Sequence, residues 1–238
     1  MRPARCAPWV RMSFGLLAAM AISSGRGATW AQDGAGKALD EIGPRAVFKP
    51  SPQDVETQLF RKMQACEAAS AWPRDAKFIS CIVSALRQAG ASPEATAGAV
   101  LLEGEGYLVD FRKMGKVDLA SAVYPLRAND NEGYVLVNGR PRVVQVEDFA
   151  NWKRIDITKD PIYPALARRF PKLELWGTGA EFKAMQPLPG GGQRFVFSFV
   201  LLNGCHACEV GGYARIAFDF NPAGELLGTK LLGLRTTR

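Results

Sequence analysis

The feature that most constrains this chain is a short cysteine loop between two apolar runs near the C-terminus. The first run, 194–204, is rich in the aromatic and β-branched residues typical of a strand, and the second spans 212–220. Between them lies Cys205-His206-Ala207-Cys208, which contains the only histidine of the 238 residues. This pattern predicts two antiparallel strands joined by a loop that carries the residues most suited to a function.

The N-terminus has the pattern of a secretory signal peptide over residues 1–31. A basic start is followed by the apolar run 12–22 and by Ala31, a small residue suited to cleavage before Gln32. The apolar run is far shorter than the ~20 residues of a membrane-spanning helix, so we expect no stable membrane insertion. These features predict a periplasmic or secreted protein after removal of the signal peptide.

The charge of the mature chain argues against a nucleic-acid partner. The whole chain has 30 Lys and Arg against 23 Asp and Glu, a net charge of +7. Four of the arginines lie in residues 1–31, which contain no acid, so residues 32–238 carry a net charge of +3. Nucleic-acid binding would require clustered lysines and arginines. We therefore expect no nucleic acid among the partners.

Four cysteines remain in the mature chain: Cys66, Cys81, Cys205 and Cys208. An even number in an oxidising compartment favours two disulfides, for which three pairings exist. An antiparallel pair of helices on either side of residues 72–73 would bring Cys66 and Cys81 face to face, which favours the local pairing of 66 with 81 and 205 with 208. A disulfide that closes a loop of ~15 residues stabilises a fold by roughly 3 kcal/mol.

The remaining patterns divide the mature chain into three regions. Residues 32–50 lack hydrophobic periodicity and predict a flexible leader. Residues 51–115 predict a helical region, with helices beginning near Ser51, Asp75 and Ser92. Residues 116–238 predict a sheet domain with a hairpin, a short helix and an antiparallel meander; the hairpin turns at Asn138-Gly139, with positive φ at both residues. The predicted fold class is α+β, an N-terminal helical hairpin region followed by a mostly antiparallel β-sheet meander with a short helix.

The residues of the cysteine loop leave four interpretations open. A Cys-x-x-Cys sequence occurs in thiol–disulfide redox sites, where the first cysteine begins a helix, whereas a strand follows here. Cys205, His206 and Cys208 supply three metal-binding side chains, without the second ligand pair of a structural zinc site. The loop can also be a purely structural staple. Finally, it can be a rigid tip that presents His206 to a partner, because a preorganised loop loses less entropy on binding.

The order of elements in the last third resembles the periplasmic inhibitor of vertebrate lysozyme family. The similarity covers residues 160–236 and rests on a strand, a cysteine loop with an internal histidine, and a hairpin near 221–224. In that family a cystine-closed loop plugs the active-site cleft of c-type lysozyme, and its histidine makes a key contact. The resemblance implies this role for Cys205, His206 and Cys208. The loop here is shorter, with two residues between the cysteines against the family's four, and Ala207 replaces the family's acid.

Together these patterns predict a secreted or periplasmic, non-catalytic binding protein that presents a disulfide-closed loop. His206 and Ala207 are the expected partner-binding residues, and a lysozyme-like glycosidase is the implied protein partner. No cofactor is expected, and no Ser/His/Asp or Cys/His catalytic arrangement is recognisable. The alternative is a periplasmic thiol–disulfide redox or metal-binding protein that uses Cys205 to Cys208.

Overall fold

The computed structural model describes residues 41–51, 55–70, 74–128, 131–148 and 155–237. The predicted signal peptide and the first part of the predicted leader lie outside the described residues. The described residues belong to one compact unit. Its described helices and mostly antiparallel sheets confirm the predicted α+β fold.

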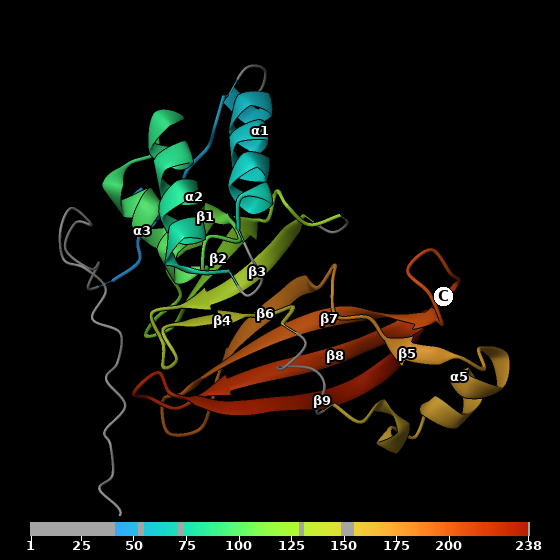
Figure 1. Ribbon diagram of the computed structural model, residues 1–238. Coiled ribbons are helices and arrows are strands. Elements are labelled where there is room, and N and C mark those ends of the chain that lie inside the picture. Colours follow the sequence, from blue (N-terminus) through green and yellow to red (C-terminus); the bar gives the residue numbers. More distant parts are fainter. Residues whose placement is uncertain (1–40, 52–54, 71–73, 129–130, 149–154, 238) are drawn as a thin grey trace, which may run out of the picture. The chain divides into compact units, whose positions relative to one another are not determined.

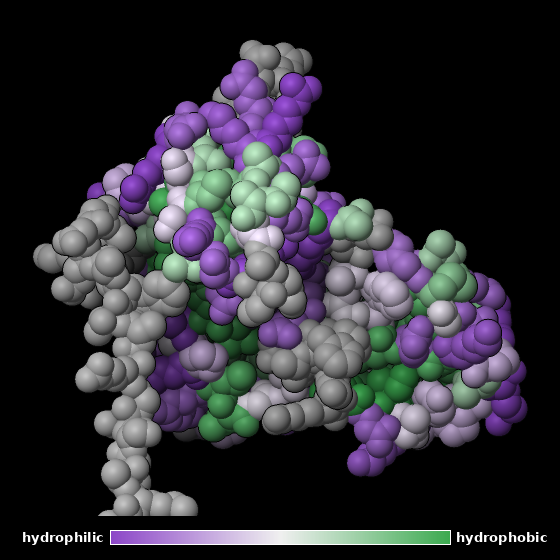
Figure 2. All heavy atoms as spheres, viewed as in Figure 1, coloured by the Kyte–Doolittle hydropathy of each residue, from purple (hydrophilic) through white to green (hydrophobic). Residues whose placement is uncertain are grey.

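The predicted helical hairpin is formed by α1 (Val55–Ala68) and α2 (Ala76–Gln88), followed by α3 (Pro93–Leu101). Asp75 caps α2 by accepting hydrogen bonds from two backbone N–H groups, and Ser92 caps α3 in the same way. The disulfide Cys66–Cys81 joins α1 to α2, with 5.7 Å between the Cα atoms. Cys66 is buried, whereas Cys81 is exposed, so the disulfide lies at the edge of the helical core. On the face that Figure 2 shows, hydrophilic residues gather over the helical region around α1.

The first sheet is antiparallel and has the strand order β1-β2-β3-β4. Its strands are β1 (Tyr107–Arg112), β2 (Asp118–Val123), β3 (Glu132–Val137) and β4 (Val143–Gln145). Strand β1 lies inside the region 51–115 that was expected to be helical. The helical path ends earlier because Glu103 and Gly104 adopt positive φ values of 56° and 75°.

The predicted hairpin at Asn138-Gly139 exists, but its turn is wider than the expected two residues. Val137 is paired with Val143, and the N–H of Asn138 donates to the carbonyl of Arg142. Asn138 has the expected positive φ of 67°, whereas Gly139 does not. The reason for glycine is close packing: a Cβ there would lie 2.9 Å from the carbonyl oxygen of Gly224 in the next hairpin.

Residues 41–50, the second part of the predicted flexible leader, are packed against the first sheet. Ile42 is 1% exposed and exchanges backbone hydrogen bonds with the side-chain amide of Asn138. Phe48 is buried and its N–H donates to the carbonyl of Leu108. The leader prediction was wrong here because isolated apolar residues, without periodicity, serve as anchors.

The second sheet has the order β5-β7-β8-β9, with β6 also paired to β7. Its strands are β5 (Leu173–Leu175), β6 (Glu181–Pro187), β7 (Gln193–Asn203), β8 (Val210–Phe220) and β9 (Leu226–Thr236). This is the predicted antiparallel meander (Figure 1). The 3-10 helix η2 (Ile157–Lys159) and helix α5 (Tyr163–Arg169) precede it.

A single hydrophobic core joins the two sheets. Phenylalanines on the inner face of β7 and β8 pack with apolar side chains of the first sheet and of α5; the residues at its centre are Leu119, Leu136, Val144, Leu166, Phe195, Phe197, Phe199, Phe218 and Phe220. The side-chain carboxamide of Gln193 joins β7 to the segment before β2 by hydrogen bonds. It accepts one from the N–H of Val117 and donates to the carbonyls of Met114 and Val117. These hydrogen bonds hold the first residue of β7 against the first sheet. Among the described residues, no helix is long and apolar enough to cross a membrane.

Candidate partner-binding loop

The cysteine loop lies at an end of the second sheet and connects β7 to β8 (Figure 1). Cys205, His206 and Ala207 are exposed, and Cys208 is half-buried. The C-terminal end of β9 lies beside the base of the loop, where Thr236 is paired with Gly212. The predicted partner-binding residues are therefore accessible on a loop anchored by two eleven-residue strands.

Local hydrogen bonds and a disulfide close the loop into one tight turn. The N–H of Cys208 donates to the carbonyl of Cys205 at 3.0 Å, and the Cys205–Cys208 disulfide spans 5.0 Å between Cα atoms. Gly204 begins the turn with a φ of 91°, a left-handed conformation that favours glycine. The chain then enters strand β8 rather than a helix, so the loop lacks the helix N-terminus that activates the first cysteine of many redox sites.

His206 lies against Trp176, which follows β5. The ring centroids are 5.5 Å apart and the planes are inclined by 52°. Trp176 is half-buried, and its indole nitrogen is enclosed without a hydrogen-bond partner among the described residues. The contact gives the imidazole a supported position on the surface, because one side of the ring rests on a rigid aromatic neighbour.

A row of side chains continues from Trp176 across the outer face of the second sheet, the face opposite the phenylalanine core. The N–H of Trp176 donates to the carbonyl of Val200 at 3.0 Å. Val200 is the cross-strand partner of Tyr213, and Tyr213 is the partner of Arg235. Directly opposed residues share a face, so these four side chains form what we call the outer row. Tyr213 is 41% exposed, which is unusual for a large hydrophobic residue in the middle of a sheet.

The charges on the outer face are arranged unevenly. Asp219 is bound by Arg194 through two hydrogen bonds of 2.6 and 2.7 Å, and Lys230 approaches it at 3.4 Å. The hydrogen bonds from Arg194 hold the pKa of Asp219 below its usual value. Arg215 and Arg235 make no ion pair with a carboxylate of the described residues. Positive charge is thus available close to Tyr213.

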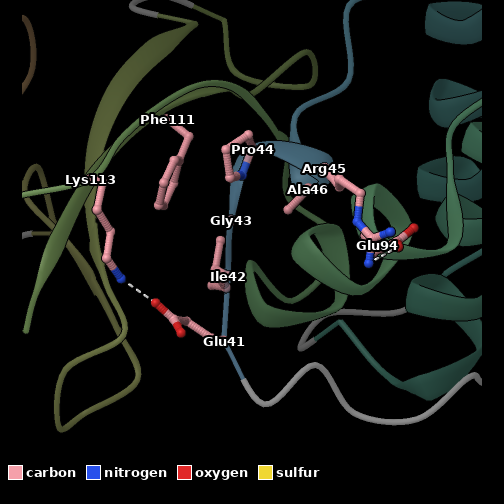
Figure 3. A pocket seen from close by; sticks show the side chains of 9 residues that line it. All are labelled: Glu41, Ile42, Gly43, Pro44, Arg45, Ala46, Glu94, Phe111 and Lys113. Atoms are coloured by element: carbon pink, nitrogen blue, oxygen red, sulfur yellow. Dashed lines mark hydrogen bonds and ion pairs between the residues drawn. The ribbon is translucent and has the colours of Figure 1, made fainter.

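A separate hollow of about 520 Å³ lies beside residues 41–46 (Figure 3). Its wall contains Phe111, and ion pairs between Lys113 and Glu41 and between Arg45 and Glu94 border it. Hydrogen bonds to Glu41 and Asp118 raise the pKa of the Lys113 ammonium. Because the four bordering charges already pair with one another, this hollow presents little net charge to a ligand.

The disulfide bears on the redox and metal interpretations of the loop. Both sulfur atoms are covalently joined in Cys205–Cys208, and a metal requires thiolates instead. Within the described ranges, no group of three or more His, Cys, Asp or Glu residues is placed to hold a metal ion. Glu103 and Glu105, which flank Gly104 beyond α3, have different surroundings: Glu103 is exposed, while Glu105 pairs with Arg74 and Arg127.

Sequence patterns located the loop but missed its neighbours. Trp176, Tyr213 and Arg235 come from three different segments and meet only through strand pairing. Tyr213, a large aromatic residue between small and apolar residues of β8, was the one available sequence signal for these neighbours.

Neither a protein-family model, nor a curated protein, nor a solved structure matches this chain.

Proposed function

We propose that this protein is a secreted or periplasmic, non-catalytic binding protein whose cystine-closed loop recognises a protein partner through His206. The observation that carries the proposal is the exposed position of His206 within a closed disulfide turn. The signal-like residues 1–31 and the two disulfides agree with an oxidising compartment.

The physical support comes from rigidity. Two long paired strands, a disulfide and the Trp176 ring restrict the loop before any partner arrives. A restricted loop gives up less conformational freedom on binding, so more of the contact energy remains as affinity. Imidazole and indole side chains also offer both apolar surface and hydrogen-bonding groups.

A lysozyme-like glycosidase is the proposed partner class. This choice rests on the resemblance of residues 160–236 to the periplasmic inhibitor of vertebrate lysozyme family, and on the accessible tip that such an interaction needs. A narrow turn with an exposed imidazole can enter a substrate cleft that is lined with carboxylates, where a histidine can donate hydrogen bonds.

The experiment measures inhibition of cell-wall hydrolysis by representatives of each lysozyme class, together with binding by calorimetry. The mature protein is expected to inhibit at least one class, and His206→Ala is expected to weaken binding about tenfold or more, about 1.4 kcal/mol. Phe60→Ala, at an exposed position on α1, serves as the control and should bind like the unaltered protein. Absence of binding to every class, or unchanged affinity in His206→Ala, would overturn the proposal.

A further inference from the structure

The outer row has features that recognition by the loop alone does not require. Trp176 and Tyr213 stand on the same face, separated by the width of two strand spacings, ~9–10 Å. Val200, which is half-buried, lies between them, and its side chain is smaller than either aromatic ring. The result is a strip of side chains with Trp176 at one end and Tyr213 beside Arg235 at the other, held by the hydrogen bonds of the sheet.

Two arginines lie along the strip. Arg235 is the partner of Tyr213 on β9, and Arg215 lies two residues further along β8 and therefore on the same face. The cross-strand neighbours of Arg215, which is half-buried, are the small residues Ser198 and Gly233. Neither arginine pairs with an acid in the described part of the chain.

We propose that the outer row, with His206 and Arg215, binds an extended polysaccharide that carries carboxylate groups, such as a β-linked uronate chain. Flat aromatic rings stack on the apolar faces of pyranose rings, and rings spaced along a rigid strip match sugars that alternate along an extended chain. Guanidinium groups bind carboxylates with two parallel hydrogen bonds, so Arg215 and Arg235 select an acidic sugar over a neutral one.

The enclosed indole nitrogen of Trp176 fits the same ligand. It is a hydrogen-bond donor without an acceptor among the described residues, and sugar hydroxyl and carboxylate oxygens are acceptors. His206, whose ring centroid lies 5.5 Å from that of Trp176, is exposed beside this donor. The inference does not depend on a glycosidase partner, and it goes beyond the proposed function because the ligand is a glycan rather than a protein.

The test is calorimetric titration of the oxidised mature protein with a hexamer of β-1,4-linked mannuronate. We expect saturable binding that weakens as salt rises, because the ion pairs are exposed. Tyr213→Ala and Arg215→Gln should each weaken binding fivefold or more, whereas Tyr213→Phe should keep it, since stacking needs only the ring. Arg168→Gln, at an exposed position on α5, is the matched arginine control and should leave affinity unchanged.

Three results would overturn the inference. The first is no binding of the mannuronate hexamer at millimolar concentration. The second is equal binding of a neutral cellohexaose, because selection by the arginines would then be absent. The third is equal binding of poly-glutamate, which would indicate a site for acidic chains in general. The glycosidase experiment uses a different ligand, so either proposal can fail while the other stands.

Discussion

At the scale of single residues, one charged pair on the outer face stands out. Arg194 and Asp219 are cross-strand neighbours, and the guanidinium donates two short hydrogen bonds to the carboxylate. The Asp219 side chain is only 14% exposed, so solvent screens the pair less than a typical surface salt bridge. The pair links β7 to β8 on the outer face of the second sheet.

Asp219→Asn should destabilise the protein by about 1–2 kcal/mol at neutral pH, because charged hydrogen bonds would be lost. The hydrogen bonds from Arg194 depress the folded-state pKa of Asp219, so its contribution is present above the unfolded pKa of ~3.9 and is lost as pH falls through the lower folded value. Urea unfolding at neutral pH and at about pH 2 measures both effects.

The matched control for this prediction is Glu181→Gln, at an exposed acid paired with Lys183. Its effect on the free energy of unfolding should stay within about 0.5 kcal/mol. A destabilisation by Asp219→Asn that is equally large at about pH 2 would contradict the assignment, because the native carboxylate would then contribute nothing through its charge.

At the scale of elements, the two disulfides close chain segments of very different length and therefore contribute differently to stability. Cys66–Cys81 joins two helices across 15 residues, whereas Cys205–Cys208 closes a turn across 3 residues. The entropy that a disulfide removes from the unfolded chain grows with the length of the closed loop. The first disulfide therefore stabilises the fold more strongly, and the second mainly shapes the turn around His206.

Replacing Cys66 and Cys81 together by serine should lower the free energy of unfolding by about 3 kcal/mol, and replacing Cys205 and Cys208 by about half as much. Denaturant unfolding of the two double variants compares them directly. An equal or larger loss from the 205/208 variant would show that the turn supports the fold of the sheet rather than presenting His206.

Elements were predictable where the signal was local. The helix starts near Asp75 and Ser92 and the strand over 194–204 were visible in the sequence and agree with the structure. Contacts between distant residues were not visible. The hydrogen bond between Gln193 and Val117 joins residues 76 positions apart, and no local sequence pattern near either residue predicts it.

In the candidate site, too, the sequence predicted what lies close together along the chain and missed the contacts between distant residues. Cys205, His206 and Cys208 are neighbours in sequence, so their placement on one turn could be predicted. Trp176, Tyr213 and Arg235 meet only once the register of four strands is set, and one residue of slippage would move them to the other face. The wide turn at Asn138 likewise depends on contact with Gly224.

At the scale of the whole molecule, one compact unit combines a helical layer, two sheets and the protruding turn. The helical region and the second sheet are linked through the first sheet, whose two faces belong to different hydrophobic clusters. This arrangement gives the N-terminal half a supporting role for the second sheet, because the core that buries the phenylalanines is completed by the first sheet. The function proposed for the turn therefore depends on the folding of the entire unit.

The measurement that tests the central claim most directly is disulfide mapping of the mature protein by mass spectrometry, after digestion without reductant. The claim is that a stable cystine, rather than a reactive or metal-bound thiol pair, surrounds His206. We expect two linked peptide pairs, Cys66 with Cys81 and Cys205 with Cys208, no free thiol, and an N-terminus at Gln32. Free thiols at Cys205 and Cys208, or a mixed disulfide with glutathione there, would contradict it.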